Sequence, residues 1–180
     1  MDIARRTLRL HLCARWRTTA PHTHARSMTD GAPALADART AEQFFAEAVR
    51  AGTYDSPALA RCRKGAFPKL GAFTCELEVT SELTNRFGTL HGGCVATLVD
   101  VLTTVALLTV TKQGGVSTDL NVSYCAPAPT GSRVLITCEV LKVGKTLAWM
   151  ECVLKNEDGD VIATGRHTKF LPVAMPVSKL

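Results

Sequence analysis

The 180-residue sequence contains no long uncharged hydrophobic run, no CxxC pair and no glycine-rich nucleotide loop. A membrane-spanning helix needs about 20 apolar residues without a charge, so we expect no membrane span. The seven cysteines are odd in number and mostly lie inside apolar segments, which is typical of reduced thiols rather than of disulfides or a zinc site. Without a nucleotide loop or a metal-ligand cluster, we expect neither NAD nor ATP nor a metal.

Acidic residues are almost absent from residues 1–28, where Asp2 alone stands against six arginines. This segment accounts for the formal net charge of +5, and the remainder of the chain is close to neutral. An Arg-rich segment with Thr and Ser that can form a basic amphipathic helix is typical of a mitochondrial transit peptide. A disordered extension with Met28 as an alternative start explains it equally well. Because basic and aromatic residues are not interleaved, we expect no nucleic-acid partner.

The hydrophobic content of 46% suffices for one domain with tails. We divide the chain into a basic extension, an N-terminal helix with a connector, a folded domain and a tail, at 1–28, 29–64, 65–172 and 173–180.

In the second segment, Thr40 is the expected cap of a helix over 41–51, and Gly52 ends it. Residues 53–64 look like an irregular connector. The tail ends in Ser178-Lys179-Leu180, the peroxisomal import tripeptide. We therefore expect an import receptor as partner and a location in the peroxisome or glycosome, with the mitochondrion as the alternative.

The stretch from Asn85 to Thr109 organises the domain and predicts a long helix. Its apolar residues cover almost the whole circumference at a period of 3.6, and a helix that is apolar all round is buried. These residues are Val95, Leu98, Val99, Leu102, Val105, Ala106 and Leu108. Asp100 lies in the middle of the helix, where a charge is costly unless it has partners or a catalytic task.

The start of this helix is unusual, because His91-Gly92-Gly93 follows the expected N-cap Thr89. Each glycine weakens the helix by about 1 kcal/mol but lets a ligand approach the backbone closely. The first N–H groups of a helix lack intrahelical partners and lie at the positive end of its dipole, which suits a developing oxyanion. The alternatives are a plain turn at the glycines and a purely structural Asp100.

Alternating apolar and polar residues predict a half-buried strand at 70–80. Turn residues separate further strands at 116–124, 133–143, 146–155 and 161–171, and the sheet is expected to be antiparallel. With one buried helix and four or five strands, the fold class is α+β. The sheet must curve around the central helix to bury it.

Several motifs resemble the hotdog-fold acyl-CoA thioesterases, most closely the thioesterase superfamily member 2 group, also called acyl-coenzyme A thioesterase 13. The resemblance covers about residues 65–171, and the phenylacetate-pathway thioesterases share only its weaker His-Gly-Gly…Asp core. The motifs are Asn85, Gly88-Thr89-Leu90-His91-Gly92-Gly93, Asp100, 116–121, 142–147 and 165–169. Arg86-Phe87 is bulkier than the family's usual loop, which could change the acyl tunnel.

The resemblance implies a hotdog fold and hydrolysis of fatty acyl-CoA, with medium and long chains favoured and coenzyme A present only as part of the substrate. Thioester hydrolysis needs a water, a base and donors for the carbonyl oxygen. By resemblance, the Gly92 N–H and the Asn85 amide polarise the carbonyl. Asp100 acts on the water as base or nucleophile, and Ser117 helps to position that water.

Gly92 and Asp100 lie about 12 Å apart along one helix, too far to share a carbonyl. The active site therefore requires a homodimer. The resemblance implies that two copies pair their sheets and that such dimers associate into a homotetramer.

The resemblance also implies that the substrate contacts residues at the helix start and in two later segments. They are His91, Gly93, Asp119, Tyr124, Pro127, Lys142, Gly144, Lys145 and Thr146. Four basic side chains could meet the phosphates of coenzyme A, namely Lys142, Lys145, Arg166 and Lys169. We expect His91 mainly to fix its loop, His167 to be structural and Cys94 to serve packing rather than nucleophilic attack.

Other functions stay open: an aromatic, phenylacetyl-type acyl-CoA thioesterase, a non-catalytic acyl-CoA binding or sensor protein, and a dehydratase or hydratase. The combination of Asp100, Asn85 and Ser117 argues against a sensor. A dehydratase would use a histidine with an acid, so aspartate on the helix favours hydrolysis.

Overall fold

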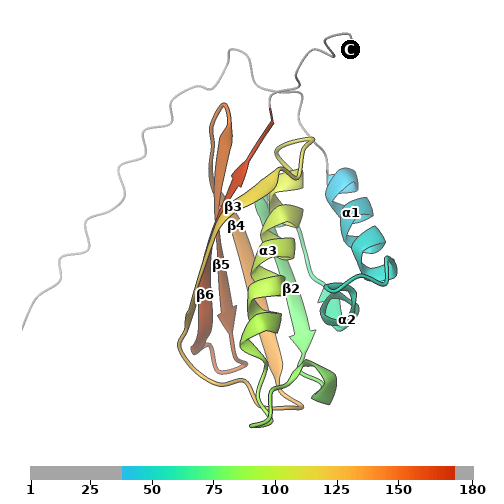
Figure 1. Cartoon of the computed structure of the whole chain (residues 1–180), viewed down its shortest axis with the longest axis vertical. Coiled ribbons are helices and arrows are strands. Elements are labelled where there is room, and N and C mark those ends of the chain that lie inside the picture. The colour runs from blue at the N-terminus through green and yellow to red at the C-terminus, as the bar shows by residue number, and fades with distance from the viewer. Residues whose placement is uncertain (1–37, 173–180) are drawn as a thin grey trace, which may run out of the picture. The chain divides into compact units, whose positions relative to one another are not determined.

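The computed structural model describes residues 38–172. The basic segment 1–28 and the terminal Ser178-Lys179-Leu180 lie outside these residues, so both targeting predictions stay predictions. Figure 1 shows the helices and strands in chain order: α1 (Ala38–Arg50), α2 (Ser56–Ala60), β1 (Cys62–Lys64), β2 (Ala72–Glu78), the 3₁₀ helix η1 (Ser81–Leu83), α3 (Gly92–Leu108), β3 (Val116–Tyr124), β4 (Arg133–Val143), β5 (Leu147–Lys155) and β6 (Val161–Phe170).

The strands form one antiparallel six-stranded sheet in the order β1-β2-β4-β5-β6-β3. Buried residues alternate with partly exposed ones, as in β5, so that one face of the sheet packs on α3. The curved sheet lies behind α3 in Figure 1, while α1 and α2 pack beside the helix. The α+β prediction and its curved sheet around a long helix are confirmed.

The predicted connector over 53–64 is wrong, because α2 and β1 lie within it. Elements of five and three residues are too short to show a periodic pattern. The first helix begins by Ala38, so that Thr40 lies inside it rather than capping it. Ala38 and Arg39 are strong helix formers and extend the predicted helix.

The start of α3 also differs from its prediction, since its N-cap is His91 and not Thr89. Thr89 instead forms a β-bridge with Pro129, and the Leu90 N–H donates to the Ala128 carbonyl at 2.8 Å. These two contacts keep the backbone extended as far as His91, so the helix begins at Gly92. Among the described residues, no helix combines the length and apolar character needed to cross a membrane.

Helix α3 is buried along the side that faces the sheet, whereas Gly93, Ala96, Thr97 and Asp100 stay partly exposed. Burial around the whole circumference, as predicted, is therefore incomplete in a single chain. The helix approaches β6 closely at Gly165, where an added Cβ would lie 2.5 Å from Val99 Cγ1. The missing side chain lets α3 lie directly on β6.

Candidate active site

The first turn of α3 presents free backbone donors, one of them at Gly92. The Nδ1 atom of His91 accepts a hydrogen bond from the Gly93 N–H at 2.9 Å. The neighbouring Gly92 N–H has no hydrogen-bond partner within residues 38–172. Since the donor lies at the positive end of a 17-residue helix, it can stabilise a developing negative charge. The prediction that His91 fixes its loop is confirmed, and its contact with substrate stays a prediction.

Tyr124 at the end of β3 covers this turn. Its hydroxyl donates to the Gly92 carbonyl at 3.0 Å, and its ring would lie 3.4 Å from a Cβ at position 92. Pro127 lies in the loop after β3, whose next residue, Ala128, bonds to Leu90. The predicted substrate contacts Tyr124 and Pro127 therefore border the same helix start.

The Asn85 side chain is held by its own turn. Its Oδ1 accepts from the Phe87 N–H at 2.9 Å, and its Nδ2 donates to Thr89 Oγ1 at 3.0 Å. A carboxamide has two N–H donors, so one remains for a ligand. Its contact with the thioester stays a prediction.

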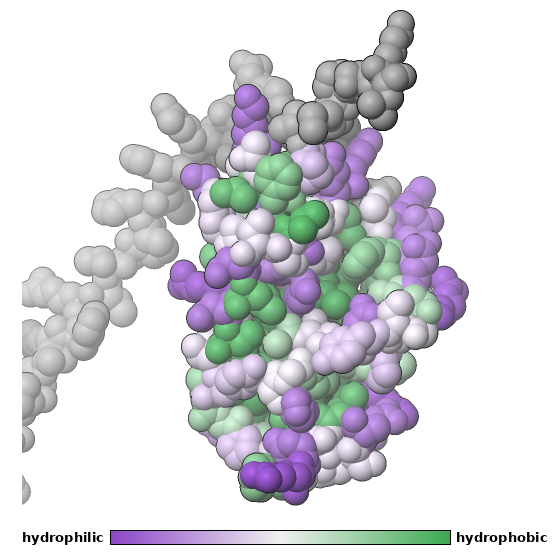
Figure 2. Space-filling model, viewed as in Figure 1, coloured by the Kyte–Doolittle hydropathy of each residue, from purple (hydrophilic) through white to green (hydrophobic). Residues whose placement is uncertain are grey.

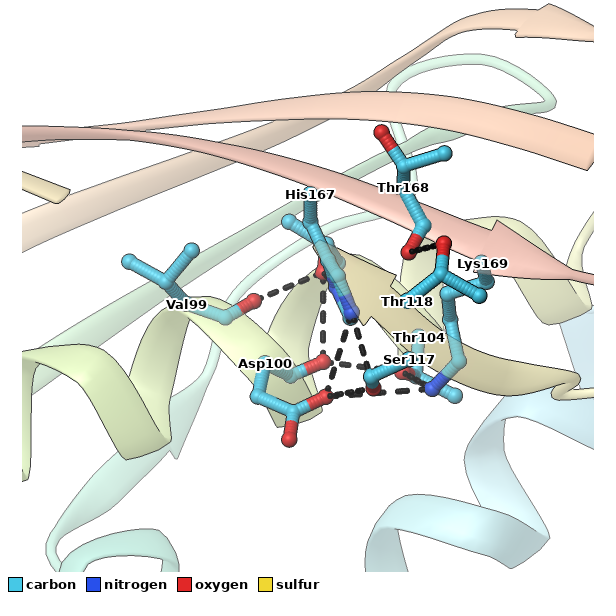
Figure 3. A network of polar contacts seen from close by, with 9 residues as sticks. Val99, Asp100, Thr104, Ser117, Thr118, His167, Thr168 and Lys169 are labelled. Atoms are coloured by element: carbon cyan, nitrogen blue, oxygen red, sulfur yellow. Dashed lines mark hydrogen bonds and ion pairs between the residues drawn. The ribbon is translucent and has the colours of Figure 1, made fainter. Parts of the chain in front are cut away.

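The carboxylate of Asp100 is held through one oxygen only (Figure 3). Ser117 Oγ donates to Oδ1 at 3.1 Å, while His167 Nε2 and Lys169 Nζ lie 3.5 and 3.8 Å from the same atom. Oδ2 makes no hydrogen bond or ion pair with any residue that the structure describes, and the side chain is 42% exposed. Asp100 therefore offers a free carboxylate oxygen to a water outside the chain.

His167 links Ser117 to the helix backbone, and its surroundings define its tautomer. Thr103 Oγ1 lies 2.6 Å from both the Val99 carbonyl and His167 Nδ1. A carbonyl only accepts, so we assign the Thr103 proton to Val99 and a proton to His167 Nδ1. His167 Nε2 is then an acceptor 2.9 Å from Ser117 Oγ. Ser117 can thus donate its single proton to either Asp100 or His167.

Burial and then the charge of Lys169 lower the pKa of His167 to about 4, against the opposing effects of Asp100 and Asp119. The imidazole is therefore neutral at pH 7, and its 3.5 Å approach to Asp100 is not an ion pair. Burial also lowers the pKa of the Lys169 ammonium, although Asp100 counteracts this effect.

Lys169 corrects one prediction, because the structure buries it. Only 6% of the residue is exposed, and its Nζ donates to Thr104 Oγ1 at 2.8 Å, so it cannot meet a phosphate at the surface. Sequence reasoning also missed Thr103 and Thr104. For Lys169 the available signal was the alternation in β6, because the face that contains Ala163 and Gly165 also contains positions 167 and 169.

The predicted site residues form separate groups along α3. The helix start is bordered by Asn85, His91, Gly92, Gly93, Tyr124 and Pro127. Asp100, in the middle of the helix, lies with Ser117 and Asp119. Lys142 lies near the end of β4, and the β4–β5 turn contains Gly144, Lys145 and Thr146. Phe170 in β6 pairs with both Val116 at the start of β3 and Leu147 at the start of β5, so these two strand starts lie at the same level of the sheet. A single chain therefore does not bring the helix start together with the other two groups.

Cys94 lies beside the helix start but is not activated. Burial raises the pKa of its thiol to about 11, so the thiol form predominates at neutral pH. This agrees with the predicted packing role. The six cysteines within the described residues are free thiols.

Comparison with known proteins agrees with this geometry. The model of the thioesterase superfamily matches residues 87–163. Human acyl-coenzyme A thioesterase 13 is 52% identical over 104 residues, which cover 56% of this chain and 74% of that protein. The zebrafish thioesterase superfamily member 2 structure aligns with a TM-score of 0.69 at 39% identity, covering 76% of this chain and 99% of that chain. The structure of mouse thioesterase superfamily member 2 aligns with a TM-score of 0.65 at 39% identity, covering 72% of this chain and 96% of that chain.

The fold and the matched region define a hotdog-fold thioesterase domain. Within the thioesterase superfamily, the chain belongs to the acyl-coenzyme A thioesterase 13 family.

Proposed function

We propose that this enzyme hydrolyses fatty acyl-CoA, with medium and long chains favoured, to a free acid and coenzyme A. The observation that carries this proposal is a pair of unsatisfied groups on one helix. Gly92 offers a free N–H, and Asp100 offers a free carboxylate oxygen. A thioester hydrolase needs this combination of an oxyanion donor and a base for water.

The two groups would have to come from different subunits of a homodimer, because eight residues of helix separate them by about 12 Å. Among residues 38–172, β3 ends the sheet with an unpaired edge, and Val116, Leu120 and Tyr124 on it are exposed. Such an edge favours pairing with another strand. Two antiparallel β3 strands centred near Leu120 would bring the start of one strand level with the end of the other.

Ser117, near the start of β3, contacts Asp100, and Tyr124, at the end of β3, contacts Gly92. This pairing would therefore place Asp100 of one chain near Gly92 of its partner. Figure 2 supports a covered face, because apolar side chains reach the surface among polar ones on the side of α3 and β3. Association of two dimers into a tetramer would cover further exposed apolar residues of the sheet, including Leu141 and Phe170.

The reaction follows from these positions. The Gly92 N–H of one subunit polarises the thioester carbonyl, with Asn85 as a second donor. Asp100 of the other subunit removes a proton from water through Oδ2, while Ser117 holds that water. Attack forms a tetrahedral oxyanion at Gly92, and its collapse breaks the C–S bond to release the coenzyme A thiolate and the carboxylic acid. The thiolate takes up the proton held by Asp100.

The phosphates of coenzyme A would be held at the β4–β5 turn, where Lys142 and Lys145 are exposed. Lys142 lies over the Trp149 ring at 5.8 Å, which directs its ammonium group to this surface. Each exposed lysine alone contributes little, so we expect them to act together.

The test is release of free thiol from short, long and aromatic acyl-CoAs by the wild type and by Asp100→Asn. Removal of the base is expected to lower kcat by about 10²- to 10⁴-fold while coenzyme A binding is retained. The best acyl group would distinguish a fatty from an aromatic acyl-CoA thioesterase. Near-normal turnover by the variant would refute the role of Asp100, and tight acyl-CoA binding without wild-type turnover would favour a sensor.

A further inference from the structure

We propose that Lys169 is a positioning residue for this reaction: its ammonium group fixes one oxygen of Asp100 and thereby directs the other oxygen at the attacking water. The inference rests on the proposed function, because it assigns a task to a group that supports the catalytic carboxylate. Lys169 itself lies behind Asp100 and is only 6% exposed, so it would touch neither the water nor the substrate.

The contacts of Lys169 join it to Asp100 twice. Directly, its Nζ lies 3.8 Å from Oδ1, and the lysine side chain is only 8% exposed. Indirectly, Nζ donates to Thr104 Oγ1 at 2.8 Å, and that hydroxyl donates to the Asp100 carbonyl at 2.8 Å. Figure 3 shows the Lys169 side chain reaching from β6 to α3 at this point. The ammonium group of Lys169 is therefore fixed relative to the backbone of Asp100.

A buried lysine requires such an explanation. An ammonium group loses hydration on burial, and packing alone could be achieved by an apolar side chain at lower cost. The face of β6 that holds Lys169 otherwise carries Ala163, Gly165 and the neutral His167. Within residues 38–172, the cost of burying the charge is offset by its attraction to Asp100 and its bond to Thr104.

The partners of Asp100 all converge on one side of the carboxylate. Ser117, His167 and Lys169 approach Oδ1, whereas Oδ2 has no polar partner among residues 38–172. A carboxylate that is 42% exposed would otherwise rotate and be solvated through either oxygen. The fixed charge at Oδ1 removes this freedom, and a misplacement of about 1 Å can cost about 100-fold in rate.

The charge of Lys169 also affects His167. The charged or titratable groups that act on this imidazole are Lys169 from β6, Asp119 from β3 and Asp100 from α3. Lys169 lowers the pKa of His167, and the two carboxylates raise it. Loss of the lysine charge is therefore expected to raise the His167 pKa, which gives a readout that a purely structural lysine would not provide.

The test compares Lys169→Met, Lys169→Arg and Thr104→Val with the control Lys69→Met, which removes an exposed lysine paired with Glu139. Lys169→Met is expected to lower kcat by about 10- to 100-fold with little change in KM. Lys169→Arg keeps the charge and should recover part of the rate. The control should match the wild type. Thr104→Val preserves the side-chain shape and should lower kcat less than Lys169→Met.

The same variants are titrated by NMR, following the His167 ring signal as assigned with His167→Gln. The midpoint should rise in Lys169→Met and stay low in Lys169→Arg. Wild-type kcat in a folded Lys169→Met would overturn the proposal, as would a loss of kcat with an unmoved midpoint. If Lys169→Met does not fold, normal kcat in Thr104→Val overturns it. An inactive wild type would instead refute the proposed function, while the His167 midpoint still tests the charge effect.

Discussion

Replacing Gly92 with proline removes one backbone N–H and leaves the remaining helix nearly unchanged. Gly92 is the first residue of α3, where proline is favoured because its N–H would have no intrahelical partner. The preceding residue, His91, has φ −67° and ψ 133°, the extended conformation that a residue before proline prefers. A Cβ at position 92 would lie 3.4 Å from the Tyr124 ring, an ordinary contact. The substitution therefore tests the oxyanion donor without distorting its surroundings.

Loss of one oxyanion donor costs about 10²- to 10³-fold in kcat, or about 3–4 kcal/mol of transition-state stabilisation. Gly92→Ala is the matched control, because it adds the same Cβ but keeps the N–H. Thiol release from acyl-CoA gives kcat and KM, and circular dichroism with size-exclusion chromatography verifies folding and assembly. Equal activity of the proline and alanine variants would refute the role of the Gly92 N–H.

Mixing Gly92→Pro with Asp100→Asn tests whether the site spans two subunits. After the two variants are unfolded and refolded together, about half of the dimers contain one chain of each variant. In each mixed dimer, one of the two sites combines an intact Gly92 with an intact Asp100. Activity should therefore reach about one quarter of the wild-type value. If Gly92 and Asp100 of the same chain cooperate, no intact site forms. Activity that stays at the level of the separate variants would therefore refute the shared site.

Two further predictions concern stability. Gly165→Ala should destabilise the fold by about 1–3 kcal/mol, because the new Cβ would lie 2.5 Å from Val99 Cγ1, and a lowered urea midpoint would demonstrate it; an unchanged midpoint would show that α3 can move off β6. The folded protein lowers the pKa of His167 to about 4. Between about pH 6.5 and 4, the unfolded chain therefore binds a proton that the folded chain does not. The free energy of unfolding should fall by about 2–3 kcal/mol as the pH decreases across this window. Urea unfolding across this pH range should show a smaller slope for His167→Gln, and an equal slope would indicate that other groups dominate.

Local patterns in the sequence were sufficient for the main elements of the domain. Turn residues on both sides of each segment predicted β3 and β4 at their observed bounds. Buried and exposed residues alternate in the first part of β4, whereas β3 is exposed along almost its whole length in the single chain. The apolar residues around Asp100 recur at a period of 3.6, and this period predicted α3. The short α2 and β1 were missed, since they contain too few residues for either period to appear.

The start of α3 shows how a local signal can be overridden. Thr89 is a good N-cap by residue type, yet its bridge to Pro129 keeps the backbone extended, and His91 takes the capping position instead. The bridge joins residues 40 positions apart, so it depends on how the loop after β3 returns to the helix. No property of the nearby sequence records this contact.

The sequence by itself determined which side chains this protein could use: the glycine pair at a helix start, a carboxylate two turns later, and Ser117 at the beginning of a strand. The tertiary structure alone decided which groups surround that carboxylate. Because the sheet places β6 next to β3, His167 and Lys169 meet Asp100 although they follow it by more than 60 residues. Strand order arises from packing of the whole sheet, and its information is spread over all six strands rather than held in any one motif.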